Sequence, residues 1–199
     1  MTRDARSKPS TAEPRQRQLL EAALGVFIRY GFRKTSMDEV ARAAQVSRQG
    51  LYLHFATKEE LFRATLQHAF ETALEEALGR LGDESAPLHE RLTGAFDAWI
   101  GRYVGVFGAD AADLNEASKA LGGASVSDHE KSLLDAVAKV LRASGLVAAY
   151  RPAGITARQL AETLNATGIG LKHRVATRAE FVEGMRIAAR AVCLSLERS

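Results

Sequence analysis

Apolar residues recur at every third or fourth position along most of the chain, a spacing typical of amphipathic helices rather than of strands. The first such pattern begins near Pro14, which suits the first turn of a helix, and stops at Gly31. A long one runs from Thr57 to Gly79 or Gly82. Two short patterns lie between them, with apolar faces formed by Met37, Val40, Ala41 and Ala44 and then by Leu51 and Phe55. We therefore expect four helices before residue 83.

Polar residues at the starts of several patterns support these boundaries. Capping-box spacing, in which a Ser or Thr precedes a Glu by three positions, occurs at Ser36 and Glu39, at Thr57 and Glu60, and at Thr177 and Glu180. Ser47 is the expected N-cap of the third helix, after a turn at residues 45–46.

A second helical region follows the segment "GDESAP" at residues 82–87. Beyond an aromatic stripe near residue 100, the pattern predicts helices over 109–121, 127–144, 156–174 and 177–197, with "GGASVS" at 122–127 as a loop. We expect an all-α protein of about nine helices. Its parts are a basic tail at 1–13, a three-helix domain at 14–60, a connecting fourth helix at 61–79 and a larger domain at 80–199.

Composition narrows the class of protein. With 46% apolar and 26% charged residues the chain is ordinary for a globular protein. Its one cysteine, Cys193, can form no internal disulfide and no cage of several thiolates, so we expect a reducing cytoplasm. Charges interrupt every apolar stretch well before the roughly 20 residues that a membrane span needs, and the polar first 13 residues lack the apolar core of a signal peptide.

The small net charge of +3 is unevenly distributed. Residues 1–60 carry 11 Lys or Arg against 7 Asp or Glu, whereas residues 61–199 carry 16 against 17. A basic N-terminal surface attracts polyanions such as nucleic acid or anionic lipid, although chance imbalance in a short segment is an equally good account.

The two short helices are below the length at which an isolated helix is stable in water, so tertiary packing must hold them. A short helix, a tight turn and a second short helix form a helix-turn-helix, whose second helix lies in a DNA major groove. With Leu51 and Phe55 inward, Gln49 and Leu53 point outward, with Gly50 and Tyr52 on the flanks. Gln can contact adenine through two hydrogen bonds, and Leu can meet a thymine methyl group.

Groups suited to phosphate surround these positions: Arg48, Tyr52, His54, Lys58 and, at the start of the second helix, Thr35 or Ser36. Taken singly, each has a plainer interpretation as a solvated or locally packed residue.

The stretch "TSMDEVARAAQVSRQGLYLHFATKEELF" at 35–62, with the preceding "RQLLEAALGVFIRYGF", resembles the N-terminal signature of the TetR family of bacterial transcriptional regulators over residues 14–70. The resemblance implies an all-α homodimer with N-terminal DNA-binding domains and a C-terminal domain for ligand binding and dimerisation. It points to a DNA-facing set of Thr35, Ser47, Arg48, Gln49, Gly50, Tyr52, His54 and Lys58. Gln49 and Gly50 depart from residues frequent in the family, so base specificity at these two positions does not carry over.

In the C-terminal domain an aromatic stripe of Phe96, Trp99, Tyr103 and Phe107 is either plain core or the wall of an effector pocket. An apolar pocket would suit a hydrophobic or aromatic effector. The last two helices carry apolar residues that either pair with a second copy or close the chain's own core: Leu160, Leu164, Leu171, Phe181, Met185, Val192 and Leu196.

An enzyme is the first rival, but the five histidines are scattered and no catalytic, metal-binding or phosphate-binding motif is present, so we expect no cofactor and no metal. Asp110, Asp113 and Glu116 form an acidic face better explained by solvation than by a metal. The leading hypothesis is a repressor released from a palindromic double-stranded DNA operator by a small effector. The alternative is a helical architectural protein with weakly specific DNA binding and no effector.

Overall fold

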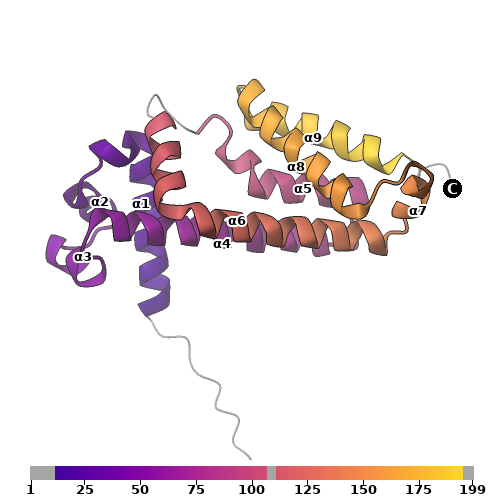
Figure 1. The fold of residues 1–199 in the computed structure, drawn as a ribbon. Coiled ribbons are helices and arrows are strands. Elements are labelled where there is room, and N and C mark those ends of the chain that lie inside the picture. Colours follow the sequence, from indigo (N-terminus) through magenta and orange to yellow (C-terminus); the bar gives the residue numbers. More distant parts are fainter. Residues whose placement is uncertain (1–11, 107–110, 195–199) are drawn as a thin grey trace, which may run out of the picture. The chain divides into compact units, whose positions relative to one another are not determined.

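The computed structural model of the 199-residue chain describes residues 12–106 and 111–194, and within these ranges it contains helices and connecting turns but no strand (Figure 1). The chain divides into two compact units. The first comprises Met1–Ala69 and Asp110–Leu121, and the second Phe70–Ala109 and Gly122–Ser199. Helices α4 (Lys58–Gly82) and α6 (Ala111–Ala143) each contribute residues to both units.

The first unit contains α1 (Ala12–Lys34), α2 (Met37–Ala43), α3 (Arg48–His54), the start of α4 and the start of α6. Its core is built on aromatic rings from α1 and α4. Phe27 and Phe62 meet edge to face with ring centroids 4.8 Å apart, and Phe32 lies 4.9 Å from Phe62. Leu51 of α3 and Val40 of α2 are fully buried, so tertiary packing holds both short helices.

Gly31 breaks α1, as the sequence predicts, although one further turn follows it. Its φ of 78° and ψ of 174° lie outside the helical region and suit glycine, which has no Cβ. The hydroxyl of Thr35 donates a hydrogen bond to the Gly31 carbonyl at 2.6 Å. The Thr35 hydroxyl thus supplies a donor for a carbonyl at the end of α1, where the helix has no further N–H to offer.

The capping predictions can be compared helix by helix. At α2 and at α9 (Arg178–Cys193) both hydrogen bonds of the capping box form, from Ser36 and from Thr177. At α4 the Glu60 N–H donates to the Thr57 hydroxyl, but the Glu60 carboxylate accepts from the N–H of Ala56 instead of Thr57. A further capping box at Thr156, which pairs with Gln159, was not predicted.

The second unit contains the rest of α4 and α6, with α5 (Leu88–Trp99), a 3-10 turn at Gly101–Tyr103, α7 (Val147–Tyr150), a 3-10 turn at Arg151–Ala153, α8 (Ala157–Arg174) and α9. Helix α9 packs against α5 and α8. Glycines permit this close packing: a Cβ on Gly101 would lie 2.8 Å from the Phe181 ring, and one on Gly184 would lie 2.8 Å from Leu171. These glycines therefore serve interhelical approach rather than backbone freedom.

One prediction along the chain is wrong. The expected loop at 122–127 is helical, because α6 is continuous through both glycines. Glycine lowers helix propensity by about 1 kcal/mol, but buried residues on either side, such as Leu114 and Leu133, outweigh that local preference. Of the two ends expected for the fourth helix, Gly82 is the one at which α4 stops, and the short helix α7 was not predicted. Within residues 12–106 and 111–194, each helix is too short or too polar to cross a lipid bilayer.

Candidate nucleic-acid interface

The turn between α2 and α3 is a tight helix C-cap with a non-glycine residue in the left-handed region. Gln45 has a φ of 55°. Its N–H donates to the Arg42 carbonyl at 3.2 Å, and the Val46 N–H donates to the Ala41 carbonyl at 3.0 Å. This pair of bonds defines a Schellman motif, which usually places glycine where Gln45 stands. The turn ends α2 sharply and lets α3 start three residues later.

Helix α3 starts at an N-cap formed by Ser47, as predicted. The Ser47 hydroxyl oxygen accepts a hydrogen bond from the Gly50 N–H at 2.9 Å. A Cβ added at Gly50 would lie only 3.0 Å from that oxygen, so the glycine keeps the cap unhindered. Ser36 plays the same role for α2, which commits both serine hydroxyls to capping.

The two faces of α3 are clearly separated. Leu51 is fully buried and Phe55 is 7% exposed, whereas Leu53 is 80% exposed and Tyr52 is 41% exposed. Gln49 also lies on the surface. Leu53 is the most exposed large apolar side chain in the part of the chain that the structure describes.

Two contacts hold Arg48 at the start of α3. Its guanidinium donates to the Asp38 carboxylate of α2 at 3.0 Å and lies 5.6 Å from the ring centroid of Tyr52. Both members of the ion pair are largely exposed, so the pair contributes at most about 1 kcal/mol to stability. Its effect is to orient the guanidinium beside the exposed face of α3. His54, at the other end of this helix, is exposed.

Two predicted contact residues have structural roles instead of free side chains. Thr35 is 2% exposed, and its hydroxyl is committed to Gly31. The Lys58 ammonium donates to three carbonyls at the end of α1, those of Phe32 at 2.9 Å, Arg33 at 3.2 Å and Thr35 at 3.0 Å. It also lies 4.6 Å from the ring centroid of Phe32. Since an ammonium has three N–H donors, all of them are engaged.

Ion pairs and a hydrogen bond from Arg33 join the end of α1 to the first turns of α6. The Arg33 backbone N–H donates to Asp113 at 2.8 Å, and its guanidinium contacts Asp113 at 3.2 Å and Glu116 at 2.9 Å. The acidic face seen in the sequence is thus paired with an arginine 80 residues earlier. Asp110 lies outside the described residues. Within the described ranges no cluster of His, Cys, Asp or Glu could hold a metal ion.

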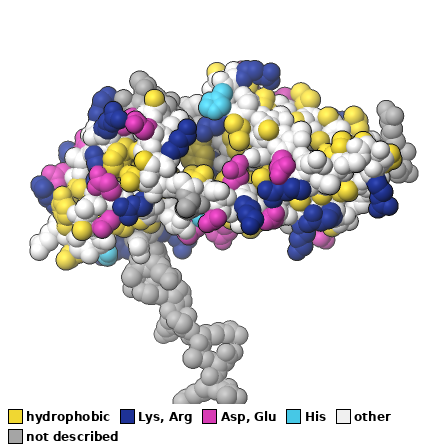
Figure 2. All heavy atoms as spheres, in the orientation of Figure 1, with side chains coloured by type: hydrophobic (Ala, Val, Ile, Leu, Met, Phe, Trp, Pro, Cys, Tyr) yellow, Lys and Arg dark blue, Asp and Glu magenta, His cyan; other side chains and the backbone are white. Residues whose placement is uncertain are grey.

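Surface charge is mixed on the face drawn in Figure 2, where Lys and Arg side chains are interspersed with Asp and Glu. A general basic patch on that face therefore does not explain attraction to a polyanion. The residue types and exposure of α3 carry more weight than net charge in assigning the interface.

The predicted effector-binding aromatic residues lie mostly in packed core. Phe96 is fully buried, and Trp99 is 8% exposed, with its ring 5.7 Å from that of Phe70. Tyr103 is half-buried, and burial raises the pKa of its phenol. Phe107 lies outside the described residues. A pocket of about 400 Å³ in the second unit is lined by other residues, between the end of α6 and the start of α8.

Most of the predicted dimer-interface residues fill the core of their own chain. Five of them are at most 6% exposed: Leu160, Leu164, Leu171, Phe181 and Met185. Val192 is half-buried, and Leu196 lies outside the described residues. Three large apolar side chains in this region are exposed instead: Ile169 of α8 at 44%, Ile187 of α9 at 61%, and Leu194, directly after α9, at 50%. The apolar periodicity therefore marks mainly the buried face of these two helices.

Comparison with known proteins connects this arrangement to a family. Residues 19–65 match the profile described as "Bacterial regulatory proteins, tetR family". The chain is 36% identical over 88 residues to the transcriptional activator FasR of Mycolicibacterium smegmatis, and 39% identical over 57 residues to a probable acrEF/envCD operon repressor of Escherichia coli K12. These matches cover 43% and 29% of this chain, and 40% and 26% of those proteins.

The likeness in three dimensions extends further than the likeness in sequence. A TetR-like transcriptional regulator from Rhodococcus sp. RHA1 superimposes on 94% of this chain and 99% of its own length, with a TM-score of 0.61 and 28% identity. These three proteins are named as an activator, an operon repressor and a transcriptional regulator. In the profile of its N-terminal helices and in its two-unit helical fold, the chain is similar to the TetR family of bacterial regulatory proteins.

Proposed function

We propose that this protein is a transcriptional regulator that binds a double-stranded DNA operator through α3. The observation that carries the proposal is the division of α3 into a buried side, with Leu51, and an exposed side, with Gln49 and Leu53. A helix presented in this way fits a major groove, where Gln can recognise adenine and Leu can contact thymine methyl groups.

We propose a smaller set of DNA contacts than the residues alone suggest. Arg48 and His54 are exposed at the two ends of α3 and suit phosphate, as does the phenol of Tyr52. Ser36, Ser47 and Gly50 support the helix starts, from which backbone N–H groups favour an anion. We propose positioning roles for Thr35 and Lys58, because their side-chain donors are used within the first unit.

A dimer follows from the geometry of operator recognition. Two recognition helices that read a palindrome must reach major grooves about 34 Å apart or a multiple of that distance. We propose that the outer faces of α8 and α9 form the dimer contact, with Ile169, Ile187 and Leu194 at its apolar centre.

The dimer contact can be tested with one charged substitution. Ile187→Arg should give monomers at a concentration where the wild type sediments as a dimer, since burying an unpaired charge in an interface is costly. Leu78→Arg, at a leucine of α4 that is 42% exposed, is the matched control and should leave the dimer intact. A dimer that survives Ile187→Arg places the contact elsewhere.

Effector control is proposed on the basis of the family. An apolar or aromatic effector bound in the C-terminal unit would favour a conformer that releases the operator, in the manner of a repressor, with a coupling of about 1–3 kcal/mol. Helices α4 and α6 contribute residues to both units and are the expected links. The matched proteins include one named as an activator and one named as a repressor, and we propose the repressor's mode for this chain. Such a regulator would act in the cytoplasm.

Selection of bound fragments from genomic DNA is the decisive experiment. A sharp palindromic consensus supports an operator-binding regulator, whereas scattered fragments with no consensus support a helical architectural protein. Gel shifts with the selected site should show log affinity falling steeply with log salt, because several phosphates are contacted. An affinity insensitive to salt would contradict binding through the exposed face of α3.

Variants then assign the contacts. Gln49→Ala should relax selection at one base pair of each half-site, with a cost of about 1–3 kcal/mol against the preferred base. Leu53→Ala should weaken operator binding, whereas Leu78→Ala, at an exposed leucine of the second unit, should not. If Leu53→Ala and Leu78→Ala bind the operator equally well, Leu53 does not face the DNA.

A further inference from the structure

The second unit contains a pocket of about 400 Å³ that the proposed DNA-binding function does not use. It lies where the end of α6, the short α7, the following 3-10 turn and the start of α8 come together. Small-molecule pockets typically measure about 300–1,000 Å³, so this one suits a ligand at the small end of that range.

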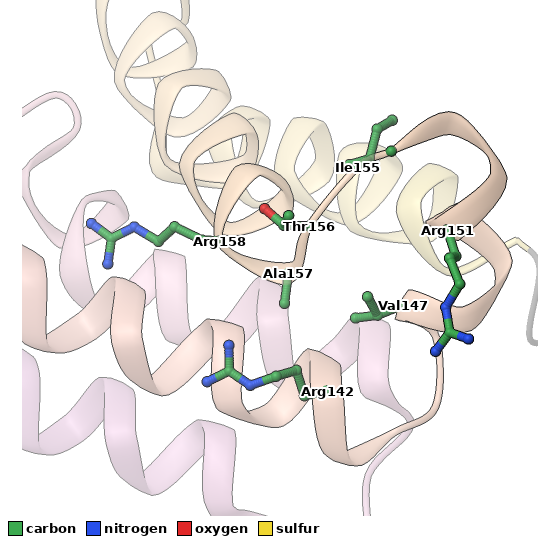
Figure 3. A pocket seen from close by; sticks show the side chains of 8 residues that line it. Arg142, Val147, Arg151, Ile155, Thr156, Ala157 and Arg158 are labelled. Atoms are coloured by element: carbon green, nitrogen blue, oxygen red, sulfur yellow. The ribbon is translucent and has the colours of Figure 1, made fainter.

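The lining of the pocket combines positive charge with apolar side chains. Figure 3 shows Arg142 and Arg158 on one side of Val147 and Ala157, and Arg151 on the other. Ile155 adds to the apolar part of the lining. A lining of this kind matches a molecule with an anionic head and an apolar body.

The three arginines differ in whether their charge is already balanced. Arg158 donates to Asp135 at 2.7 Å and to Glu162 at 2.7 Å, so two carboxylates neutralise it. Arg142 and Arg151 form no ion pair with any carboxylate in the part of the chain that the structure describes. Two uncompensated guanidinium groups therefore border the pocket.

The capping box at the start of α8 adds no negative charge beside Arg142 and Arg151. The Thr156 hydroxyl accepts from the Gln159 N–H, and the Gln159 amide oxygen accepts from the Thr156 N–H. The cap is therefore made by a neutral side chain, whereas α2 and α9 use Glu39 and Glu180 in the equivalent position. No carboxylate of the cap competes for Arg142 or Arg151.

We infer that this pocket binds a small amphipathic organic anion, which is attracted by the positive charge of Arg142 and Arg151 on its two sides and whose short apolar chain lies against Val147, Ile155 and Ala157. A planar carboxylate is favoured because guanidinium groups match it with paired hydrogen bonds. The apolar lining separates such a ligand from an inorganic anion, which gains nothing from burial against methyl groups.

Titration calorimetry with octanoate tests the inference directly, without DNA, so its result is independent of operator binding. Octanoate should bind with saturation, and its neutral analogue octanamide should bind at least about tenfold more weakly, as expected for loss of charged hydrogen bonds. Acetate should bind at least about a hundredfold more weakly than octanoate, because it lacks six methylenes, and burial of three or four of them at about a fourfold factor each already gives that ratio.

Paired variants locate the site. Arg142→Gln/Arg151→Gln should weaken octanoate binding at least about tenfold. Arg63→Gln/Arg80→Gln removes the same charge from exposed positions on α4 and should change it less than about twofold. All four arginines are exposed, and thermal melting of each variant checks that the fold is unchanged.

Three results would overturn the inference. They are no saturable binding of octanoate up to about 10 mM, equal affinity for octanoate and octanamide, and equal weakening in both double variants. The first removes the site, the second removes its preference for anions, and the third reduces the effect to general attraction by a basic surface.

Discussion

Replacing Lys58 by methionine separates two roles that this lysine can have. In the structure its ammonium joins the start of α4 to the end of α1 through the carbonyls of Phe32, Arg33 and Thr35. Methionine keeps most of the apolar stem and removes the charge and all three donors. The substitution therefore tests the ammonium rather than the packing of the side chain.

The magnitude follows from the hydrogen bonds that the substitution removes. A hydrogen bond to a charged group typically contributes about 1.5–3 kcal/mol, but the three bonds share one ammonium and are not additive. Lys58 is half-buried, so water can replace part of the interaction. The cation held 4.6 Å from the Phe32 ring centroid adds about 0.5–1 kcal/mol. We expect Lys58→Met to lower the free energy of unfolding of the first unit by about 2–4 kcal/mol.

Hydrogen exchange of the amides of α1, α2 and α3 measures this destabilisation locally. Arg63→Met is the matched control, because it removes one positive charge from an exposed position of the same helix and should change protection by less than about 0.5 kcal/mol. Trp99 is the single tryptophan and lies in the second unit, so its fluorescence gives an internal reference. Lys58→Met should leave that signal unchanged at temperatures below melting.

The opposite pattern would refute the reasoning. If Lys58 contacts DNA phosphate instead, Lys58→Met should leave the protection of α1 to α3 intact and lower the slope of log affinity against log salt by about 0.9. A positioning role predicts reduced protection with an unchanged salt slope.

Three further predictions follow from local geometry. Gln45→Gly should raise stability by up to about 1 kcal/mol in urea denaturation, because glycine adopts the left-handed conformation without strain; a destabilised variant would contradict this. Gly101→Ala should lower it by about 1–3 kcal/mol, since the new Cβ would overlap packed side chains, whereas Gly79→Ala, with open space around it, should raise it by about 0.5–1 kcal/mol. Hydrogen bonds from the N–H groups of Thr177 and Ala176 lower the pKa of Glu180 from its ordinary 4.5, so the stability they give is present at neutral pH and lost as the pH falls through the lowered pKa. Glu180→Gln should therefore melt with a shallower acid dependence than the wild type, and identical acid limbs would contradict the assignment.

Helix starts were predictable because their signals are local. A capping hydroxyl and its acidic partner lie three residues apart, and the hydrogen bonds they form at Ser36 and Thr177 involve only neighbouring backbone. The same holds for the break at Gly31. These features need no knowledge of the rest of the fold.

The loop predicted at 122–127 was wrong because local preference competes with distant packing. Two consecutive glycines disfavour a helix, but α6 has buried residues on both sides of them, in the two different units. Whether the segment is helical or a loop depends on contacts of α6 with α1, α4 and α8, which lie far away in the sequence. The ion pair between Arg33 and Asp113 could not be predicted for the same reason, since 80 residues separate the two side chains.

The candidate interfaces show how far an apolar pattern reaches. On α3 the pattern assigns Leu51 to the inside and, by rotation, leaves Gln49 and Leu53 outside, which is how the structure places them. On α8 and α9 the pattern equally marks a buried side, but it does not say whether the chain itself or a second copy does the burying. The structure shows that Leu164 and Met185 are buried within their own chain. A contact with a second copy would therefore use apolar side chains that remain exposed, such as Ile187.

Lys58 shows that an outward position and an available donor are different properties. Periodicity places a lysine near the DNA-facing side, and the resemblance to a family makes a phosphate contact the natural expectation. Whether its three N–H groups are already engaged depends on where the end of α1 lies, 23 to 26 residues earlier in the chain. A residue can therefore stand in the right frame for recognition while its hydrogen bonds serve the fold, so each candidate contact must be judged by its existing partners as well as by its exposure.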